Sequence, residues 1–417
     1  MKIKTRKTCR ICGSPLIEVI NLGNQTLGNS FLYPKDEKLP SAPLELVRCD
    51  AESNNGCGLV QLRHTVPAHI LYTEYWYRSG VNQTMKVHLA NIAKKTEKIA
   101  GLKSGDNVLD IGCNDGTLLL SYTTSGIKRI GIDPAGNIIT TAKKHGVEVV
   151  NDFFSSTVFF KSCKKKAKVI TSIAMFYDLE DPNKFVSDIK KILHEDGLWV
   201  IELSYLPMML KSNSFDTICH EHLEYYALAP IEFMLMNHGL EAIDVEFNEI
   251  NGGSFRLYIT HRGKKAASKF LLKTRKEEKG LNLTSEKPYK IFINNIEKIK
   301  NKLTNLIKSE HALGKKIFVY GASTKGNTIL QFCNLDNKII TAAADRNPEK
   351  WGKITPGTNI PIVSEEEARD SKPDYFLVLP WHFFAEFVKR EKKFLKAGGK
   401  FIFPLPEVKI IDKGVLE

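Results

Sequence analysis

The sequence predicts an α/β protein whose central domain is a doubly wound, mostly parallel sheet. Strand-like runs alternate with helical segments between residues 105 and 205, and a glycine turn directly follows the first run. Sheets that bind ligands at the carboxyl ends of their strands have this pattern. The 417 residues are enough for two or three domains with large cores. We expect domains at residues 1–65, 66–260 and 261–417.

The first 65 residues are rich in Cys, Gly, Pro and Asn and have only short apolar runs, so they cannot bury much core alone. Cys9 and Cys12 place two thiolates on one turn, which is half of a tetrahedral zinc site. Cys49 and Cys57 complete a set of four, although seven residues separate them. We predict a structural zinc ion that holds this segment together. The alternative is two unrelated pairs of thiols.

An aromatic cluster and a predicted helix come next. The cluster consists of Tyr72, Tyr75, Trp76 and Tyr77. The helical pattern runs through Met85, Leu89, Ile92 and Ile99. The strands that follow are expected at residues 107–111, 129–132, 147–150, 169–173 and 198–203.

The turn after the first strand is suited to a nucleoside-bearing cofactor. Gly112 and Gly116 let the backbone approach a ligand closely, but the GxxxG spacing lacks the second glycine of dinucleotide-binding turns. We therefore predict S-adenosylmethionine, with Asp133 on the ribose hydroxyls and Asp110 near the amino group. The alternative is a turn without a ligand. The predicted cofactor-binding residues are Asp110, Gly112, Asn114, Gly116, Asp133, Pro134, Asp152 and Phe153, the last two beside the adenine.

A loop or lid is expected around residues 206–226, and it contains His220-Glu221-His222. An imidazole there can remove a proton from a carbon next to a carbonyl, with Glu221 orienting or assisting it. A metal-binding pair or surface histidines fit this short motif equally well. A helix at 230–237 should end at His238-Gly239, followed by an antiparallel pair at 241–247 and 254–261.

Residues 262–315 are polar and lysine-rich, with a helical pattern from 289 to 313. A second α/β unit follows, with strands expected at 316–320, 339–343, 375–378 and 400–403. Its turn at 321–326 brings backbone amides, a hydroxyl and an ammonium together where an anion can bind. The spacing is not that of an ATP-hydrolysing loop. Ser254 and Arg256 form a second predicted phosphate or sugar clamp. Ordinary turn chemistry is the alternative for both groups.

The formal net charge of +13 suits a nucleic acid, a membrane surface or a phosphorylated small substrate, without choosing among them. No run approaches the ~18 apolar residues of a membrane span. The charged N-terminus runs into Thr8-Cys9 without an apolar segment, so we expect no signal peptide and a cytoplasmic protein. The aromatics cluster in one segment and no basic base-reading helix stands out, which disfavours a nucleic acid partner.

Taken together, these motifs resemble the three-domain, zinc-containing sugar C-methyltransferases, which act on nucleotide-linked 4-keto-deoxy sugars. The resemblance spans nearly the whole chain and is specific because the motifs occur in one order. They are the Cys9-x-x-Cys12-Gly13 start, residues 57–62, residues 75–80 (Tyr-Trp-Tyr-Arg-Ser-Gly), the 110–116 turn, His220-Glu221-His222, residues 251–256 and residues 320–328.

The resemblance implies a central class I (Rossmann-like) methyltransferase fold, a small N-terminal zinc-binding domain and a C-terminal α/β domain that helps hold the nucleotide. It also implies a role in deoxysugar biosynthesis. In the family a base removes the proton next to the keto group, and the enolate carbon attacks the methyl group of S-adenosylmethionine. His222 matches that base, with Glu221, Tyr75 or Tyr77 assisting and His220 nearby. The residues expected to contact the substrate are Arg78, Asn251, Ser254, Arg256, Ser323, Lys325 and Asn327.

The chain departs from the family pattern at two places. Cys219 stands where the family often has Tyr, and residues 50–56 are inserted between the second pair of cysteines. Two other functions share parts of these features. An O- or N-methyltransferase of a small metabolite has the same fold and cofactor turn, and a zinc-ribbon protein that modifies or binds RNA has the basic charge.

Overall fold

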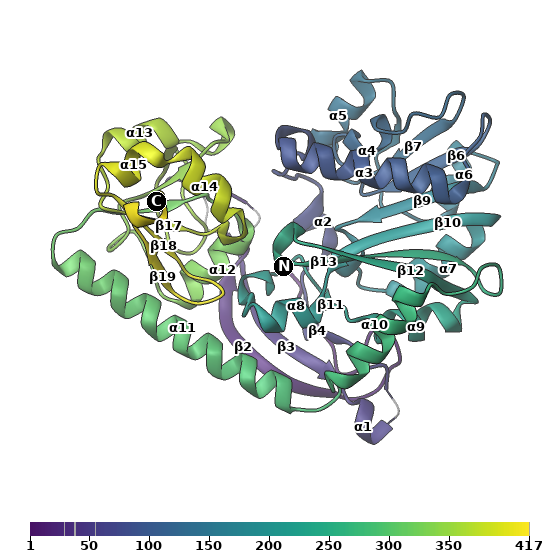
Figure 1. The fold of residues 1–417 in the computed structure, drawn as a ribbon, viewed down its shortest axis with the longest axis horizontal. Coiled ribbons are helices and arrows are strands. Elements are labelled where there is room, and N and C mark those ends of the chain that lie inside the picture. The colour runs from purple at the N-terminus through teal and green to yellow at the C-terminus, as the bar shows by residue number, and fades with distance from the viewer. Residues whose placement is uncertain (29, 37–38, 55, 417) are drawn as a thin grey trace.

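The computed structural model describes residues 1–28, 30–36, 39–54 and 56–416. Figure 1 shows two α/β lobes that stand side by side and are joined below by an N-terminal sheet and one long helix. The lobe on the right contains the central sheet, and the lobe on the left contains the C-terminal sheet.

The central lobe is built on a seven-stranded sheet, all seven strands of which were predicted. In spatial order it consists of β12 (Leu240–Asn248), β13 (Ser254–His261), β10 (Leu193–Ser204), β9 (Ala167–Ile173), β6 (Asn107–Ile111), β7 (Lys128–Ile132) and β8 (Glu148–Val150). The strands from β10 to β8 are parallel, and β12 and β13 form the antiparallel edge. This arrangement confirms the predicted doubly wound sheet and its antiparallel pair.

Helices cover both faces of this sheet. They are α3 (Gln83–Ala100), α4 (Thr117–Leu120), α5 (Gly136–Lys144), α6 (Ser156–Ser162), α7 (Pro182–Ile192) and α9 (Leu228–Asn237), and the short α2 (Ala68–Tyr72) precedes them. Helix α3 begins where the Asn82 side chain accepts a hydrogen bond from the Thr84 amide, and it ends at Gly101. Its buried residues Leu89 and Ile92 lie on the predicted apolar face.

The N-terminal segment forms a four-stranded antiparallel sheet whose long hairpin was not predicted. Its order is β11 (Glu224–Tyr225), β4 (Val60–Leu62), β3 (Ser41–Cys49) and β2 (Leu16–Thr26). A small sheet pairs β1 (Lys4–Thr5) with β5 (His64–Thr65), and α1 (Ala51–Asn54) lies in the insertion, whose residue Asn55 is outside the described residues. The sheet buries Leu22, Leu44 and Leu46 in a core that it shares with the C-terminal lobe.

The predicted loop or lid at 206–226 is instead a folded segment. It contains α8 (Leu206–Lys211), the 3₁₀ turn η3 (Phe215–Thr217) and strand β11, which pairs with β4. The apolar side chains of Met209, Phe215 and Ile218 are buried in the shared core. Burial of these side chains ties the segment to the N-terminal sheet, so it is part of the fold.

The C-terminal lobe has a six-stranded sheet with helices around it. The strand order is β16 (Ile362–Ser364), β15 (Ala342–Asp345), β14 (Ile317–Tyr320), β17 (Tyr375–Val378), β18 (Lys400–Phe403) and β19 (Lys409–Ile411). Its helices are α12 (Thr324–Phe332), α13 (Glu365–Asp370), α14 (Phe384–Arg390) and α15 (Lys392–Lys396). Strand β15 begins three residues later than the predicted 339–343 run, and β16 and β19 were not predicted.

Two helices connect the lobes. Helix α10 (Lys269–Gly280) was missed by the sequence analysis, whereas α11 (Lys287–Ala312) matches the predicted 289–313 pattern. Phe292, Ile296 and Leu303 of α11 are fully buried against residues of all three parts of the chain. In the part of the chain that the structure describes, no helix is long and apolar enough to cross a membrane.

Candidate active site

Four cysteine side chains come together at the end of the N-terminal sheet. The sulfur atoms of Cys9, Cys12, Cys49 and Cys57 all lie within 4.8 Å of one another, with 3.5 Å between Cys9 and Cys57 and 3.4 Å between Cys12 and Cys49. A tetrahedral zinc ion with Zn–S bonds of ~2.3 Å needs sulfur atoms roughly 3.8 Å apart, so this cluster fits it. Four thiolates leave no open position, which makes the site structural.

The insertion between the second pair of cysteines is accommodated next to this cluster. A Cβ atom on Gly56 would lie 2.5 Å from Cys49 Sγ and 2.7 Å from the Asp50 carbonyl oxygen. Only a glycine therefore fits beside the Cys49 thiolate. The seven-residue spacing, which weakened the sequence match to a zinc ribbon, is taken up by α1 without separating the sulfur atoms.

The predicted cofactor turn lies at the carboxyl ends of β6 and β7. Gly112 has a φ of 70°, and a Cβ atom there would lie 3.1 Å from Met175 Cγ, so the turn approaches the neighbouring strand end closely. The Asp133 carboxylate accepts hydrogen bonds from the amides of Asn114 and Ala135, each 2.8 Å long. These bonds leave lone pairs on both oxygens for ribose hydroxyls. The cradle therefore fits S-adenosylmethionine.

Burial raises the pKa of both acids of this turn, Asp110 and Asp133. Burial raises the pKa of Asp110 to about 7, although Thr171 Oγ1 donates a 2.6 Å hydrogen bond to it. Burial also raises the pKa of Asp133, against the opposing effect of its two amide donors. Asp152 and Phe153 follow β8 at an exposed position, and Phe153 exposes 41% of its surface. Pro134 accepts a hydrogen bond from Asn151 beside them.

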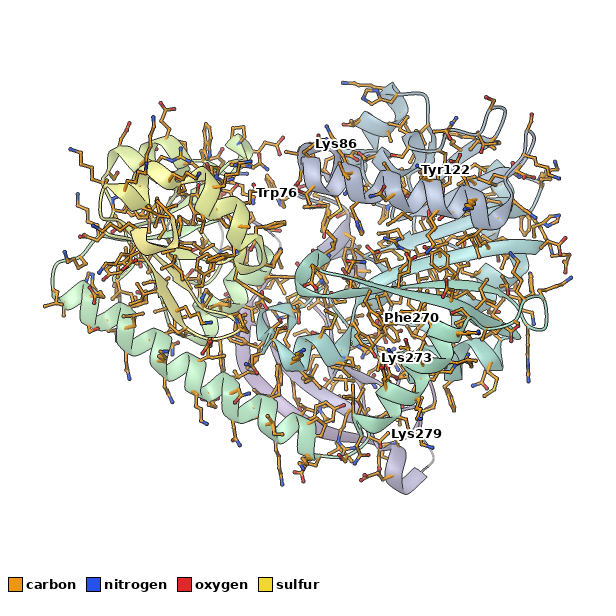
Figure 2. All side chains as sticks on the ribbon, viewed as in Figure 1. Trp76, Lys86, Tyr122, Phe270, Lys273 and Lys279 are labelled. Atoms are coloured by element: carbon orange, nitrogen blue, oxygen red, sulfur yellow. The ribbon has the colours of Figure 1, made fainter. Side chains whose placement is uncertain are left out.

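The aromatic segment at 75–80 is bonded across the cofactor turn. The Asn114 side chain donates to the Tyr77 carbonyl and accepts from the Ser79 amide, and the Gly80 amide donates to Asp115. Tyr75 exchanges two hydrogen bonds with Asn137 of α5. The segment is therefore held over the turn. Its Trp76, labelled in Figure 2, lies between the lobes with its ring edge-on to Phe31 at 6.2 Å.

The His222 ring has a defined orientation in the loop after β10. Its Nδ1 lies 3.0 Å from the Thr217 carbonyl oxygen, and its ring is edge-on to Tyr177 at 4.5 Å. Because a carbonyl oxygen only accepts, a neutral ring carries its proton on Nδ1 and leaves the lone pair on Nε2. Burial, reinforced by the Lys325 charge, lowers the pKa of His222 to about 3. The ring is thus neutral at neutral pH.

Glu221 is a buried carboxyl group without a hydrogen-bond partner for either oxygen among the described residues. Burial raises its pKa to about 7. Burial and the charge of Glu221 also raise the pKa of Asp178, which was not predicted. The negative charges of Glu221 and Asp178 add to burial in raising the pKa of Tyr75. The Tyr72 hydroxyl donates a hydrogen bond to the Glu221 carbonyl oxygen at 2.7 Å. A cluster of two acids and two tyrosines therefore lies beside the histidine.

The remaining predicted catalytic residues lie elsewhere. His220 is buried with Nε2 3.0 Å from the Ala42 carbonyl oxygen, so its ring points toward the N-terminal sheet, and burial lowers its pKa to about 4. The Tyr77 side chain is 46% exposed. Among the predicted catalytic residues, the structure groups His222, Glu221 and Tyr75.

Two predicted substrate residues meet at the interface of the lobes. The Lys325 ammonium donates to the Asn251 carbonyl oxygen at 3.5 Å. Beside them, Asp216 accepts a 3.0 Å hydrogen bond from the Trp381 indole. The Lys325 charge opposes the burial-driven rise in the pKa of Asp216.

The other predicted substrate residues already have partners within the protein. Arg256 pairs with Glu202 at 2.7 Å and with Glu246 at 3.1 Å inside the central sheet. Ser254 donates to the Ile250 carbonyl oxygen. The Ser323 hydroxyl accepts from the Gly326 amide at the start of α12, and the Asn327 side chain donates to the Gly28 carbonyl oxygen. In both predicted clamps, some of the side chains are therefore already bonded within turns or ion pairs of the protein.

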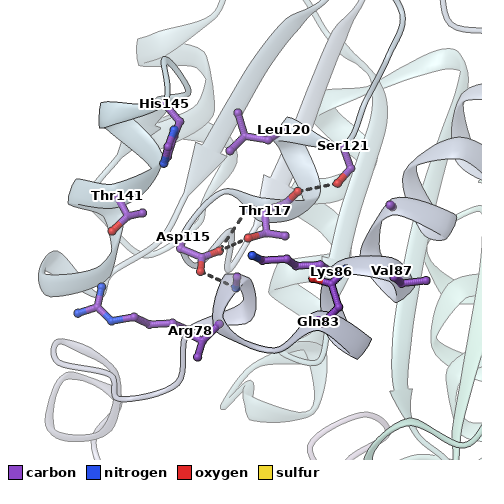
Figure 3. Close-up of a pocket in the computed structure, with 13 residues that line it drawn as sticks. Arg78, Gln83, Lys86, Val87, Asp115, Thr117, Leu120, Ser121, Thr141 and His145 are labelled. Carbon is purple, nitrogen blue, oxygen red and sulfur yellow. Dashed lines mark hydrogen bonds between the residues drawn. The ribbon is translucent and has the colours of Figure 1, made fainter. Parts of the chain in front are cut away.

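Arg78, the seventh predicted substrate residue, lies 3.7 Å from Glu349 of the C-terminal lobe. It also lines a groove of about 620 Å³ in the central lobe, between α3, α4 and α5. Figure 3 shows this groove, in which the Thr117 hydroxyl donates a hydrogen bond to Asp115. The Gly80 amide donates to the same carboxylate. The groove was not predicted.

Some residues of the site were not predicted from the sequence. Asp178 follows the predicted strand at 169–173, and an acid beyond a strand end was the available signal. Asp216 and His382 come from different lobes and meet Lys325 only in three dimensions. No local pattern indicates them.

Three family models match successive parts of the chain. They are described as "Putative zinc binding domain" at residues 9–72, "Methyltransferase domain" at 84–245 and "C-methyltransferase C-terminal domain" at 249–406. With the sheet topology, the cofactor turn and the cysteine cluster, these matches define an S-adenosylmethionine-dependent methyltransferase with a class I fold and a structural zinc site.

The C-methyltransferase NovU of Streptomyces niveus is 31% identical over 414 residues, which are 97% of this chain and 96% of that protein. The chain belongs to this C-methyltransferase family. A ubiquinone biosynthesis O-methyltransferase of Glaesserella parasuis serovar 5 is 30% identical over 28% of this chain and 53% of that protein. A solved S-adenosylmethionine-dependent methyltransferase of Clostridium acetobutylicum has 12% identity and a TM-score of 0.35 over 43% of this chain and 92% of that chain.

NovU, which matches nearly the whole chain, is a C-methyltransferase, whereas the O-methyltransferase matches about a quarter of the chain. The comparisons therefore support a C-methyltransferase over the O- or N-methyltransferase that the sequence left open.

Proposed function

We propose that this chain methylates the carbon next to the keto group of a nucleotide-linked 4-keto-deoxy sugar, with His222 as the base. The orientation of the His222 ring carries this proposal. The Thr217 carbonyl holds Nδ1, and Nε2 has no hydrogen-bond partner among the described residues. An imidazole held in this way presents its lone pair to a substrate.

The low pKa of His222 restricts the substrate. An imidazole with a pKa of about 3 is neutral at neutral pH but is a weak base. It can remove a proton only from a carbon that a neighbouring carbonyl has acidified. This requirement supports a keto substrate, which the family resemblance also implies.

The neighbours of His222 can complete the proton transfer. Glu221, with a pKa of about 7, exchanges a proton readily near neutral pH. Tyr75 lies within reach of the charges of Glu221 and Asp178 and keeps its phenolic proton, because burial raises its pKa. A neutral phenol is a hydrogen-bond donor and suits a sugar oxygen.

The two lobes have separate binding roles in this proposal. The turn with Gly112 and Asp133 holds S-adenosylmethionine, which supplies an electrophilic methyl group. Lys325 of the C-terminal lobe, together with the neighbouring Asn251 of the central lobe, faces the sugar substrate. The site thus lies between the lobes, where neither domain alone would complete it.

Replacing His222 tests the proposal. A panel of nucleoside diphosphate 4-keto-6-deoxy sugars is incubated with the protein and methyl-labelled S-adenosylmethionine, and products are identified by mass spectrometry. We expect methyl transfer to carbon by the wild type. His222→Asn should lower the rate by about 10²–10⁴, as expected for loss of a general base, while S-adenosylmethionine still binds.

Solvent-deuterium exchange at the carbon next to the keto group separates the base from other roles. His222→Asn should lose this exchange, whereas His311→Asn, which changes an exposed histidine at the end of α11, should keep it. Exchange that survives in His222→Asn would assign the base to another residue.

A further inference from the structure

One lysine of the C-terminal lobe reaches the loop that carries His222. Lys325 lies in the first turn of α12, and its ammonium donates to the Asn251 carbonyl oxygen at 3.5 Å. Helix α12 is fixed to this loop because the Thr328 hydroxyl donates to the Ile218 carbonyl oxygen at 3.2 Å. The ammonium is therefore placed at the interface of the two lobes by contacts on both sides.

The groups whose pKa values respond to the Lys325 charge lie around its ammonium. It contributes to the lowered pKa values of His222 and of His382, the latter at about 3 and mainly due to burial. It also acts against the burial-driven rise in the pKa of Cys219. One oxygen of the buried Asp216 carboxyl has no hydrogen-bond partner among the described residues. Lys325 is thus the cation of a buried polar cluster.

Enolate formation needs a hydrogen-bond donor or a cation at the carbonyl oxygen, and Lys325 is both. Removal of a proton next to a carbonyl places negative charge on the carbonyl oxygen, and a weak base such as His222 depends on stabilisation of that charge. The Tyr72 hydroxyl already donates to the Glu221 carbonyl oxygen. Cys219 remains a neutral thiol because burial and Glu221 raise its pKa, and a thiol is a weak donor.

On the basis of the proposed function, we propose that the Lys325 ammonium contacts the keto oxygen of the substrate and stabilises the enolate. The C–H bond next to the carbonyl breaks, its proton moves to Nε2 of His222, and the electron pair moves through the new C=C bond onto the oxygen. The ammonium donates a hydrogen bond to that oxygen and keeps its own protons. This role differs from the predicted anion site at the 321–326 turn, in which Lys325 would hold a phosphate.

Lys325→Met distinguishes the two roles. The test measures solvent-deuterium exchange with the panel of 4-keto-6-deoxy sugar nucleotides in the presence of S-adenosylhomocysteine, so methyl transfer is not required. We expect the exchange rate at saturating sugar to fall by about 10²–10³, as for loss of one oxyanion donor. Calorimetric affinities for the corresponding nucleoside diphosphates should stay unchanged. Lys325→Arg should restore part of the exchange, because it keeps a charged donor.

Lys338→Met is the matched control, because Lys338 is an exposed lysine of the same lobe. Lys325→Gln provides a second uncharged variant, and the thermal unfolding of each variant shows whether it has folded. Normal exchange in a folded Lys325→Met or Lys325→Gln would overturn the proposal. Loss of nucleoside diphosphate affinity with exchange preserved at saturation would also overturn it, in favour of the phosphate role. A wild-type protein that binds S-adenosylmethionine but exchanges no keto sugar would instead overturn the proposed function itself.

Discussion

Single residues of the site differ in how far the sequence could place them. His222, Glu221 and Lys325 were predicted from short motifs, and the structure brings their loops together. Arg256 was predicted as a clamp from the Gly-Gly-Ser-x-Arg pattern, but its guanidinium pairs with Glu202 and Glu246. Those two carboxylates come from neighbouring strands. Pairing across strands depends on sheet order, which a local motif does not contain.

The stability of the protein should depend on pH through Glu221. Its pKa is raised from an ordinary 4.5 to about 7, because the group is buried. Protonated Glu221 therefore favours the folded state. This contribution is fully present below about pH 4.5 and is lost as the pH rises through about 7, which amounts to roughly 3 kcal/mol.

Glu221→Gln removes this titration. Urea denaturation of the wild type and the variant at about pH 5 and about pH 8 should show that the wild type loses more stability with rising pH, by roughly 3 kcal/mol. Glu366→Gln, at an exposed position of α13, should follow the wild type. An identical pH dependence in Glu221→Gln would contradict the prediction.

At the scale of elements, the sequence predicts those that are buried on both faces. Strands β6 and β9 are continuous apolar runs between turns, so their pattern is complete in itself. The hairpin β2–β3 was missed because register shifts after Glu18 and Asn21 interrupt the alternation along β2 and because Pro43 lies within β3. Its sheet is also completed by β11, far along the chain. Helix α10 was missed because most of its residues are charged, including Lys273 and Lys279, which are labelled in Figure 2.

The cysteine cluster joins three stretches of the N-terminal segment. It links the turn at Cys9 and Cys12 to the end of β3 at Cys49 and to Cys57 before β4. We predict that Cys57→Ser reduces the bound zinc from one ion per chain toward zero and lowers the melting temperature, because the end of β3 loses its crosslink. Elemental analysis of protein purified without chelator measures the metal.

Cys333→Ala is the control for this prediction. Cys333 is a buried thiol at the end of α12, and the structure places it outside the cysteine cluster. This variant should retain the zinc even if the loss of a buried side chain lowers its stability. Full zinc retention and native melting in Cys57→Ser would show that the fourth ligand is a different residue.

At the scale of the whole molecule, one core holds the parts together. Leu44 of the N-terminal sheet, Phe215 of the 206–226 segment, Phe292 of α11 and Ile329 of α12 belong to the same buried cluster. The sequence indicates three units but not this shared core, because each contributing element exposes one apolar face that could pack within its own domain. The shared core also forms the active site, because the core packs the C-terminal lobe against the segment that carries His222.

The last prediction concerns this coupling between the lobes. Phe292 is fully buried in α11, whereas the adjacent Ile291 is 53% exposed. Phe292→Ala should cost about 3–5 kcal/mol, because it removes a buried aromatic ring and leaves a cavity. Since the ring packs into a core that spans three parts of the chain, amide hydrogen exchange should rise in both β2 and β14. The separate core beneath α4, which contains Leu118, should keep its protection. Ile291→Ala should change neither pattern, and a rise confined to the C-terminal lobe would show that the shared core does not couple the domains.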